Sequence, residues 1–177
     1  MDAVAKKARV AKGTLYLYFP TKEDLALSVH IYDYQLWFKD LSEFLDSDLK
    51  ETLHFPEWFV QSIVDHPRFI KLLPIVPTIL EKNASYETIK EYKYELLTQL
   101  GRILPRLTTR LGFKKEEDSF MFMMQCHAIA IGAWSHGFPS STVMRVLDED
   151  ALKVFQIDYV SFVKSSIDIL QKGYKEK

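Results

Sequence analysis

The sequence has little of several features that would place it in a specialised protein class. It contains one cysteine, Cys126, among 177 residues, so no disulfide can form within the chain. That scarcity is typical of proteins from a reducing cytoplasm. No apolar run reaches the roughly 18 residues of a membrane span, and the start M-D-A-V-A-K-K lacks the apolar core of a signal peptide. We therefore expect a cytoplasmic protein without a membrane partner.

The sequence also lacks the motifs that bring catalytic or metal-binding groups together. It has no glycine-rich phosphate loop, no C-x-x-C and no H-E-x-x-H. Cys126 and His127 are adjacent, so on a helix their side chains point about 100° apart and form no dyad. The other histidines, His66 and His136 among them, follow no metal-ligand spacing. We therefore expect no enzyme activity, no cofactor and no metal site.

Apolar residues recur at helical spacing along most of the chain. Hydrophobic residues make up 47% of it and charged residues 27%, a balance typical of a globular protein. Spacings of three and four residues place apolar side chains on one face of a helix, and so predict an all-α fold. The expected helices are Met1–Ala8, Lys12–Phe19, Lys22–Leu45, Glu57–Asp65, Tyr86–Leu111, Glu116–Ser135 and Asp150–Lys172.

Proline, glycine and acidic residues mark the predicted breaks between helices. Pro74 and Pro77 interrupt the apolar stretch of residues 69–80, so we expect a kinked helix or two short pieces there. Residues 81–85 are predicted to form a loop, Pro105 to bend its helix, and Gly112 to cap it. Asp46-Ser47-Asp48 is predicted to end the connecting helix. These breaks suggest a head with its connecting helix over residues 1–45 and a body over residues 46–177.

The start of the chain contains two short apolar-periodic segments separated by Arg9-Val10-Ala11. Two helices joined by a short turn are the geometry that lays a second helix in the DNA major groove. Residues 1–22 carry a net charge of +4, whereas the whole chain carries −1. A local basic patch is the footprint of a phosphate-binding module. An ordinary solvated helical hairpin could show the same charge, so the charge pattern leaves both interpretations open.

The segment K-G-T-L-Y-L-Y-F-P-T-K-E-D-L, which begins at Lys12, resembles the DNA-binding signature of the tetracycline-repressor (TetR) family of bacterial transcriptional regulators. The resemblance implies that Leu15 and Phe19 lie in the core. It also implies that Thr14 and Tyr16 approach DNA and that Lys22 holds a phosphate, with all three on one side. The expected contacts to double-stranded DNA are Lys12, Gly13, Thr14, Tyr16, Tyr18 and Lys22.

The head departs from the family pattern in three places. Family members usually have glycine at the turn, where this chain has Arg9, and a side chain with positive φ costs about 1 kcal/mol. The usual serine is Ala11, so the second helix lacks a side-chain N-cap that is worth about 1 kcal/mol. The family also has an earlier helix that covers the apolar face, and we expect this chain to lack it. We expect residues 1–20 to be mobile or shifted, operator binding to be poor, and four residues to need cover: Val4, Ala8, Leu15 and Phe19.

Aromatic side chains with polar ends gather in the predicted body helices. Core or interface packing is the ordinary explanation for each, and a ligand cavity between helices is the functional one. The resemblance favours the cavity, because family members bind small effectors here. No Lys or Arg falls in the surrounding apolar runs, so we expect a largely apolar effector in a cavity of about 300 Å³. The predicted ligand-binding residues are Trp37, Trp58, Ser62, His66, Tyr92, Met121, Met124 and Gln125, with His127 and Trp134 as further candidates.

The segment of residues 116–135 is apolar nearly all round, so its helix must be buried on more than one side. Its cover is either the core of the same chain or a second subunit. We predict a homodimer in which this helix and the last helix form a four-helix bundle with their symmetry mates. A last helix that closes a monomeric core is the competing interpretation. The predicted interface residues are Ala128, Gly132, Phe155, Tyr159, Phe162, Val163 and Ile167.

Together these features predict a ligand-responsive repressor that binds a palindromic operator as a homodimer and is released by a small apolar effector. Two other classes remain open. One is a helical small-molecule-binding protein with a non-functional DNA-binding head, which salt-dependent binding to duplex DNA would argue against. The other is a helical enzyme, which turnover surviving the loss of Lys12 and Lys22 would support.

Overall fold

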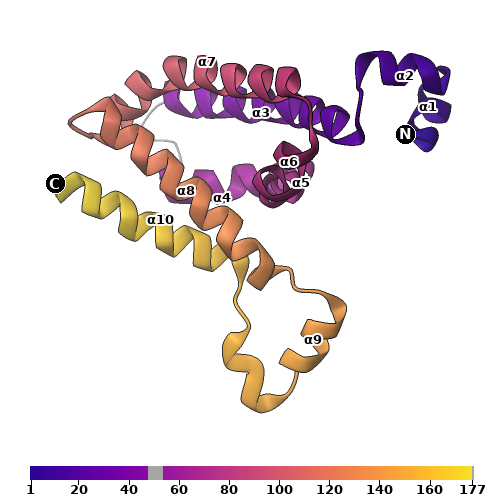
Figure 1. The fold of residues 1–177 in the computed structure, drawn as a ribbon. Helices are drawn as coiled ribbons and strands as arrows, with labels where there is room; N and C mark the ends of the chain where they lie inside the picture. Colours follow the sequence, from indigo (N-terminus) through magenta and orange to yellow (C-terminus); the bar gives the residue numbers. More distant parts are fainter. Residues whose placement is uncertain (48–53, 177) are drawn as a thin grey trace.

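The computed structural model describes residues 1–47 and 54–176, and the regular structure within those ranges is helical, with no strand. A small head lies beyond the end of a long helix, and the remaining helices form a body (Figure 1). The head consists of α1 (Asp2–Ala8) and α2 (Lys12–Tyr18), and α3 (Lys22–Asp46) runs from it into the body. The predicted all-α fold is confirmed.

The middle of the chain forms a run of short helical pieces. These are α4 (Phe55–Asp65), α5 (Pro67–Leu72), a 3-10 turn η1 (Leu73–Ile75), a π-helical turn η2 (Val76–Leu80) and α6 (Glu81–Asn83). The predicted break at Pro74 and Pro77 is confirmed, because both prolines lie in non-α turns. The predicted loop over residues 81–85 is wrong in part, since α6 occupies its first three positions. Asp48, from the predicted break after α3, lies outside the described residues.

The second half of the body contains two long helices. They are α7 (Tyr86–Leu111), with the predicted bounds, and α8 (Glu116–Gly137). Gly112 caps α7 with φ of 72°, a conformation that glycine adopts without steric cost. The chain then forms α9 (Ser141–Leu147), η3 (Asp150–Phe155) and α10 (Tyr159–Glu176). The predicted helix Asp150–Lys172 is wrong in part. Residues 159–172 lie in α10, but residues 156–158 are not helical and α10 continues past Gly173. α9 was not predicted.

The core lies where α3, α4, α7, α8 and α10 meet. Leu41, Leu107, Phe122 and Val163, from four of these helices, are wholly buried. α3 and α7 run side by side (Figure 1), and Arg106 of α7 donates to the Ser42 carbonyl of α3 at 2.7 Å. These contacts hold the connecting helix against the body.

The turn of the head carries the unfavourable conformation that the sequence predicted. Arg9 has φ of 58° and ψ of 38°, in the left-handed region, and its backbone N–H donates to the Lys6 carbonyl while the Val10 N–H donates to the Ala5 carbonyl, so the two together cap α1. Ala11 lies at the N-cap of α2 and provides no side-chain hydrogen bond. Both departures therefore leave the head less stable than the family pattern would make it.

Replacing Arg9 by Gly is expected to stabilise the head by about 1 kcal/mol, because glycine adopts a positive φ without the clash of a Cβ atom. Arg9→Ala is the matched control, since it removes the same charge but keeps the Cβ atom. Amide hydrogen exchange within α1 and α2 reports the free energy of local opening. Exchange slowed equally by both substitutions would show that charge, rather than backbone conformation, limits the head.

Candidate functional site

The head buries one side of α2 against α1. Ala5 of α1 and Leu15 of α2 are buried, which confirms the core position of Leu15, and Phe19 is half-buried. Val4 and Ala8, the other two residues that were predicted to need cover, are exposed. The rest of α2 faces outward, so the helix expected to contact DNA presents a broad free surface.

The predicted DNA contacts lie on two flanks of that surface. Lys12, Gly13, Thr14, Tyr16 and Tyr18 are all exposed. Residues two apart on a helix point about 200° apart, so Thr14 and Tyr16 cannot share one side, and that expectation is wrong. Thr14 and Tyr18, one turn apart, share one flank. Tyr16 lies on the other flank, with the Lys12 ammonium 6.0 Å from its ring centre.

The two lysines expected near phosphates are exposed and only loosely engaged. The Lys12 ammonium lies 2.8 Å from a carboxylate oxygen of Asp2, and that of Lys22 lies 3.7 Å from Glu23. The Asp2 carboxylate raises the pKa of Lys12, so this lysine is a cation at neutral pH. Exposed ion pairs of this kind are weak, and a DNA phosphate can compete for both lysines.

A capping box begins α3 directly after the turn that ends the head. The Thr21 hydroxyl accepts from the Asp24 backbone N–H at 3.0 Å, and the Asp24 carboxylate accepts from the Thr21 backbone N–H at 2.9 Å. The second oxygen of Asp24 accepts from the backbone N–H of Ser85 at 2.8 Å. Burial alone would raise the pKa of Asp24, but these donors lower it to about 2. Asp24 therefore joins the base of the head to the start of α7.

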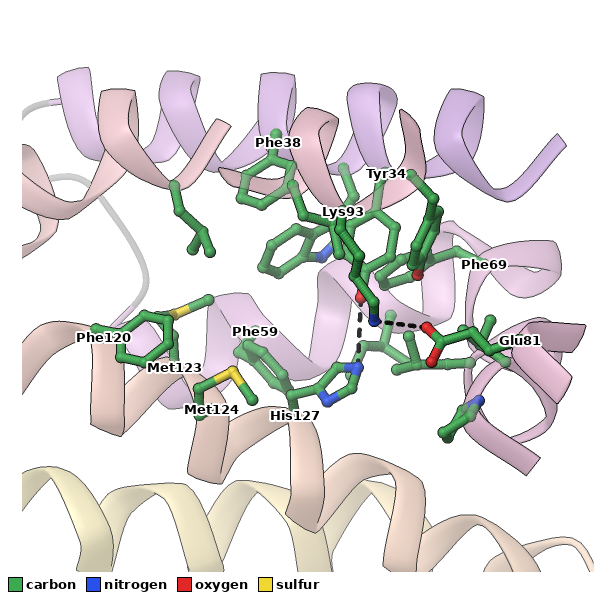
Figure 2. Close-up of a pocket in the computed structure, with 18 residues that line it drawn as sticks. Tyr34, Phe38, Phe59, Phe69, Glu81, Lys93, Phe120, Met123, Met124 and His127 are labelled. Atoms are coloured by element: carbon green, nitrogen blue, oxygen red, sulfur yellow. Dashed lines mark hydrogen bonds and ion pairs between the residues drawn. The ribbon is translucent and has the colours of Figure 1, made fainter. Parts of the chain in front are cut away.

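A cavity of about 210 Å³ lies in the body between α3, α4, α5, α7 and α8. Aromatic and aliphatic side chains make up most of its wall (Figure 2). Phe120 and Met124 are partly exposed at its edge. The volume is smaller than the predicted cavity of about 300 Å³, so it suits a smaller ligand. The lining residues are Tyr34, Trp37, Phe38, Phe59, Ile63, Phe69, Leu73, Val76, Pro77, Glu81, Tyr92, Lys93, Leu96, Leu100, Phe120, Met123, Met124 and His127.

Two polar pairs interrupt this apolar wall. The Tyr34 hydroxyl and His127 Nε2 lie 3.3 Å apart, and the Lys93 ammonium lies 2.6 Å from a Glu81 carboxylate oxygen (Figure 2). Burial lowers the pKa of His127, and the Lys93 charge lowers it further, so His127 is neutral at neutral pH. No Lys or Arg was expected beside the cavity, because none falls in the apolar runs, but Lys93 of α7 lines it. The wall therefore offers one neutral pair and one charged pair for hydrogen bonding.

Three of the eight predicted ligand-binding residues line the cavity: Trp37, Tyr92 and Met124. The other five do not, and the prediction is corrected for them. Ser62 accepts a hydrogen bond from the Trp37 indole at 2.9 Å, and so helps to orient the Trp37 side chain in the cavity wall without lining the cavity itself. Trp58 stacks on Phe44, with ring centres 4.7 Å apart. His66 pairs with Asp40, Gln125 accepts from the Tyr174 hydroxyl, and Met121 is exposed on α8.

The wall residues that the sequence analysis missed belong to two kinds. Tyr34, Phe59 and Phe69 have the helical spacing of core residues, and no local signal separates a cavity wall from a packed core. Glu81 and Lys93 resemble ordinary surface charges, 12 residues apart, and only the fold brings them together. His127 was among the polar-ended candidates, and that feature was the available signal.

The outer faces of α8 and α10 carry apolar surface on a single chain. On α8, Ala128 and Gly132 are exposed, as the dimer prediction requires. Phe162 of α10 and Phe155 of η3 are also exposed, but Phe155 is not on the same helix. Tyr159, Val163 and Ile167 are buried inside the protomer, so the prediction that they meet a partner is wrong. They pack in the core of one chain, and the neighbouring exposed side chains form the outer face of α10.

Two family models match this chain, one for each part of the fold. The model described as bacterial regulatory proteins, tetR family, matches residues 1–29, and the model described as Tetracyclin repressor-like, C-terminal domain, matches residues 32–177. The chain belongs to the TetR family. No curated protein matches it. Because TetR-family regulators bind DNA through the head and respond to ligands in the body, this chain is a DNA-binding transcriptional regulator.

The TetR assignment fits the arrangement of the described residues. The two matched ranges meet within α3, the helix that joins the head to the cavity. Cys126 is wholly buried, and burial raises the pKa of its thiol, so the thiol is unreactive. Within residues 1–47 and 54–176, no three His, Cys, Asp or Glu side chains are grouped to hold a metal ion. No helix in those ranges is long and apolar enough to cross a membrane.

Proposed function

We propose that this protein is a transcriptional repressor that binds a palindromic operator as a homodimer and leaves it when a small effector fills the body cavity. The effector is largely apolar, to match the aromatic wall, and carries one or two groups that hydrogen-bond to Tyr34, His127 or the Glu81–Lys93 pair. A protein that acts on DNA in this way works in the cytoplasm.

The observation that carries this proposal is a short segment that reaches from the cavity to the base of the head. Glu81 lines the cavity, and Ser85 follows it after the single turn of α6. The backbone N–H of Ser85 donates to Asp24, whose other oxygen belongs to the capping box beside the head. The same segment therefore contacts the effector site and the residue that fixes the start of α3.

Effector binding can use this connection by competing for the Glu81–Lys93 pair. An effector group that binds Lys93 releases Glu81, and α6 can then shift together with Ser85. A shift at Ser85 removes the hydrogen bond that Asp24 accepts from the Ser85 N–H, and the capping box and head can reorient. A ligand shifts such an equilibrium only by its different affinity for the two states, and the Lys93 contact provides that difference.

The homodimer in this proposal is built on the exposed faces of α8 and α10. Ala128 and Gly132 leave a strip on α8 without bulky side chains, and Phe162 and Ile169 are exposed on α10. A twofold interface must be self-complementary. Two heads held in this way can meet half-sites about 34 Å apart on one face of the duplex.

Replacing Lys22 by Ala is expected to weaken binding to all duplex sequences alike, because it removes a phosphate contact and its released counterion. The slope of log K against log salt should fall by about 1 for each bound head. Lys114→Ala is the matched control, since Lys114 is exposed in the turn between α7 and α8.

Fluorescence anisotropy of a labelled duplex over a salt series measures both quantities. The slope should change for Lys22→Ala and stay constant for Lys114→Ala. A wild-type chain that binds no duplex at low salt would favour the alternative of a ligand-binding protein with a non-functional head.

A further inference from the structure

The most exposed apolar side chain on the helix expected to contact DNA is Leu17 of α2, at 83% exposure. Leu15, the residue that anchors α2 to α1, is buried. Because two helical positions differ by about 200°, Leu17 points away from the core of the head. No described residue covers it, and exposing this much apolar surface has no benefit for the fold.

Gly13 lies one turn before Leu17 on the same outward ridge. A Cβ atom built at Gly13 would meet nothing within 4 Å, so the fold of the chain does not require glycine there. A helix with glycine at an interior position is less stable than one with alanine there. The outward ridge of α2 therefore consists of Leu17 and of Gly13, which leaves open space beside it. Thr14 and Tyr18 lie on one side of this ridge, and Tyr16 lies on the other.

The surroundings of this ridge favour DNA as the surface that covers it. Lys6, Lys7 and Arg9 are exposed on α1 and its turn, and Lys12 and Lys22 are exposed at the two ends of the α2 segment. These cations complement phosphates on both sides of a groove. The gap at Gly13 lets the backbone of α2 approach the base edges closely.

A leucine in the major groove has one favourable partner among the base edges. Its side chain neither donates nor accepts a hydrogen bond, and the C5-methyl of thymine is the apolar group that the bases present there. We propose that Leu17 selects thymine in each half-site by packing against this methyl group. The inference rests on the proposed DNA-binding function and adds a sequence preference to it.

The test begins with duplexes selected from a random-sequence pool by the wild-type protein. Each thymine of the selected site is then replaced by uracil, which removes only the methyl group. Burial of one methyl is worth about fourfold in affinity, so one position per half-site should show about a fourfold loss. Replacing the equivalent thymines of both half-sites should cost about fifteenfold.

Two substitutions assign this effect to Leu17. Leu17→Ala should bind the thymine and uracil duplexes equally, whereas the control Val4→Ala, at an exposed apolar residue of α1, should keep the wild-type ratio. Leu17→Arg, carried through a new selection, should replace the thymine preference with guanine, because Arg pairs with the O6 and N7 acceptors of that base.

The outcomes separate this inference from the function on which it rests. Failure to enrich any sequence would overturn both the operator function and the role of Leu17. A selected site bound equally well with thymine and uracil at every position would overturn the role of Leu17 alone. Thymine discrimination that persists in Leu17→Ala would also overturn it, and would place the methyl contact on another residue.

Discussion

Gly132→Arg is expected to yield a monomer that no longer binds the operator tightly. Gly132 is exposed on one chain, and a Cβ atom there meets nothing within 4 Å, so the fold of the protomer can accept the larger side chain. In the proposed dimer, the same position lies where two helices approach, and the guanidinium group would be buried without a partner. Loss of the second head should weaken operator binding by about a hundredfold or more.

Gly101→Arg is the matched control for this substitution. Gly101 is also an exposed helical glycine with open space around it, but it lies on α7, outside the proposed interface. Analytical ultracentrifugation should show a dimer for the wild type and Gly101→Arg, and a monomer or unfolded protein for Gly132→Arg. Sedimentation of the wild type as a monomer at micromolar concentration would contradict the dimer directly.

His30→Leu is expected to stabilise the protein and to remove much of its sensitivity to mild acid. His30 is wholly buried in α3, and neither ring nitrogen has a hydrogen-bond partner in the described chain. Its ring stacks on Phe69 and Tyr92 and meets Tyr34 edge to face. An apolar side chain of similar size avoids the cost of burying these unpaired nitrogens.

The pH dependence follows from the shifted pKa of His30. Burial lowers it from 6.5 to about 4, against the opposing charge of Asp33 and with a further decrease from His127. Between these values the unfolded chain binds the proton and the folded chain does not, so stability is full above pH 6.5 and is lost as the pH falls toward 4. The loss is about 1.4 kcal/mol per pH unit, or about 3 kcal/mol over the whole interval.

Urea denaturation of the wild type and His30→Leu at several pH values in this interval measures the effect. The difference in free energy of unfolding should grow as the pH falls, since the wild type alone has to keep His30 neutral. His127, whose pKa burial also lowers, contributes a slope that both proteins share. Parallel curves for the two proteins would show that His30 does not titrate on unfolding.

Features fixed by neighbouring residues could be predicted from the sequence. Thr21 and Asp24 are three positions apart, so their capping box depends only on the start of one helix. Gly112 caps α7, and Arg9 has the predicted positive φ, for equally local reasons. α7 begins at Tyr86 and ends at Leu111, directly before Gly112, as predicted.

Features fixed by tertiary packing could not be predicted in this way. The apolar stripe of Tyr159, Val163 and Ile167 is equally suited to a partner or to the core of its own chain, and it occupies the core. Ser62 lies on a helix of the cavity wall but turns toward the indole of Trp37. Lys93 lines the cavity beside Glu81, which is 12 positions away in the sequence, so no local pattern indicates this contact. The inward faces of the helices, together with α9 and the start of α10, depended on tertiary packing.

The central claim is that occupancy of the cavity and release of DNA are a single event. It can be tested in the double variant Trp58→Phe, Trp134→Phe, which retains Trp37 of the cavity wall as its only tryptophan. Small aromatic compounds that raise its melting temperature are titrated into its complex with a labelled duplex, and Trp37 emission and duplex anisotropy are read in the same sample. Leu96→Trp, which fills the cavity from α7, is the control expected to bind DNA without responding to the compound.

The account predicts that quenching of Trp37 and release of the duplex share one half-saturation concentration, and that Leu96→Trp releases no DNA at that concentration. A compound that saturates the quenching of Trp37 while the duplex stays bound would contradict the account.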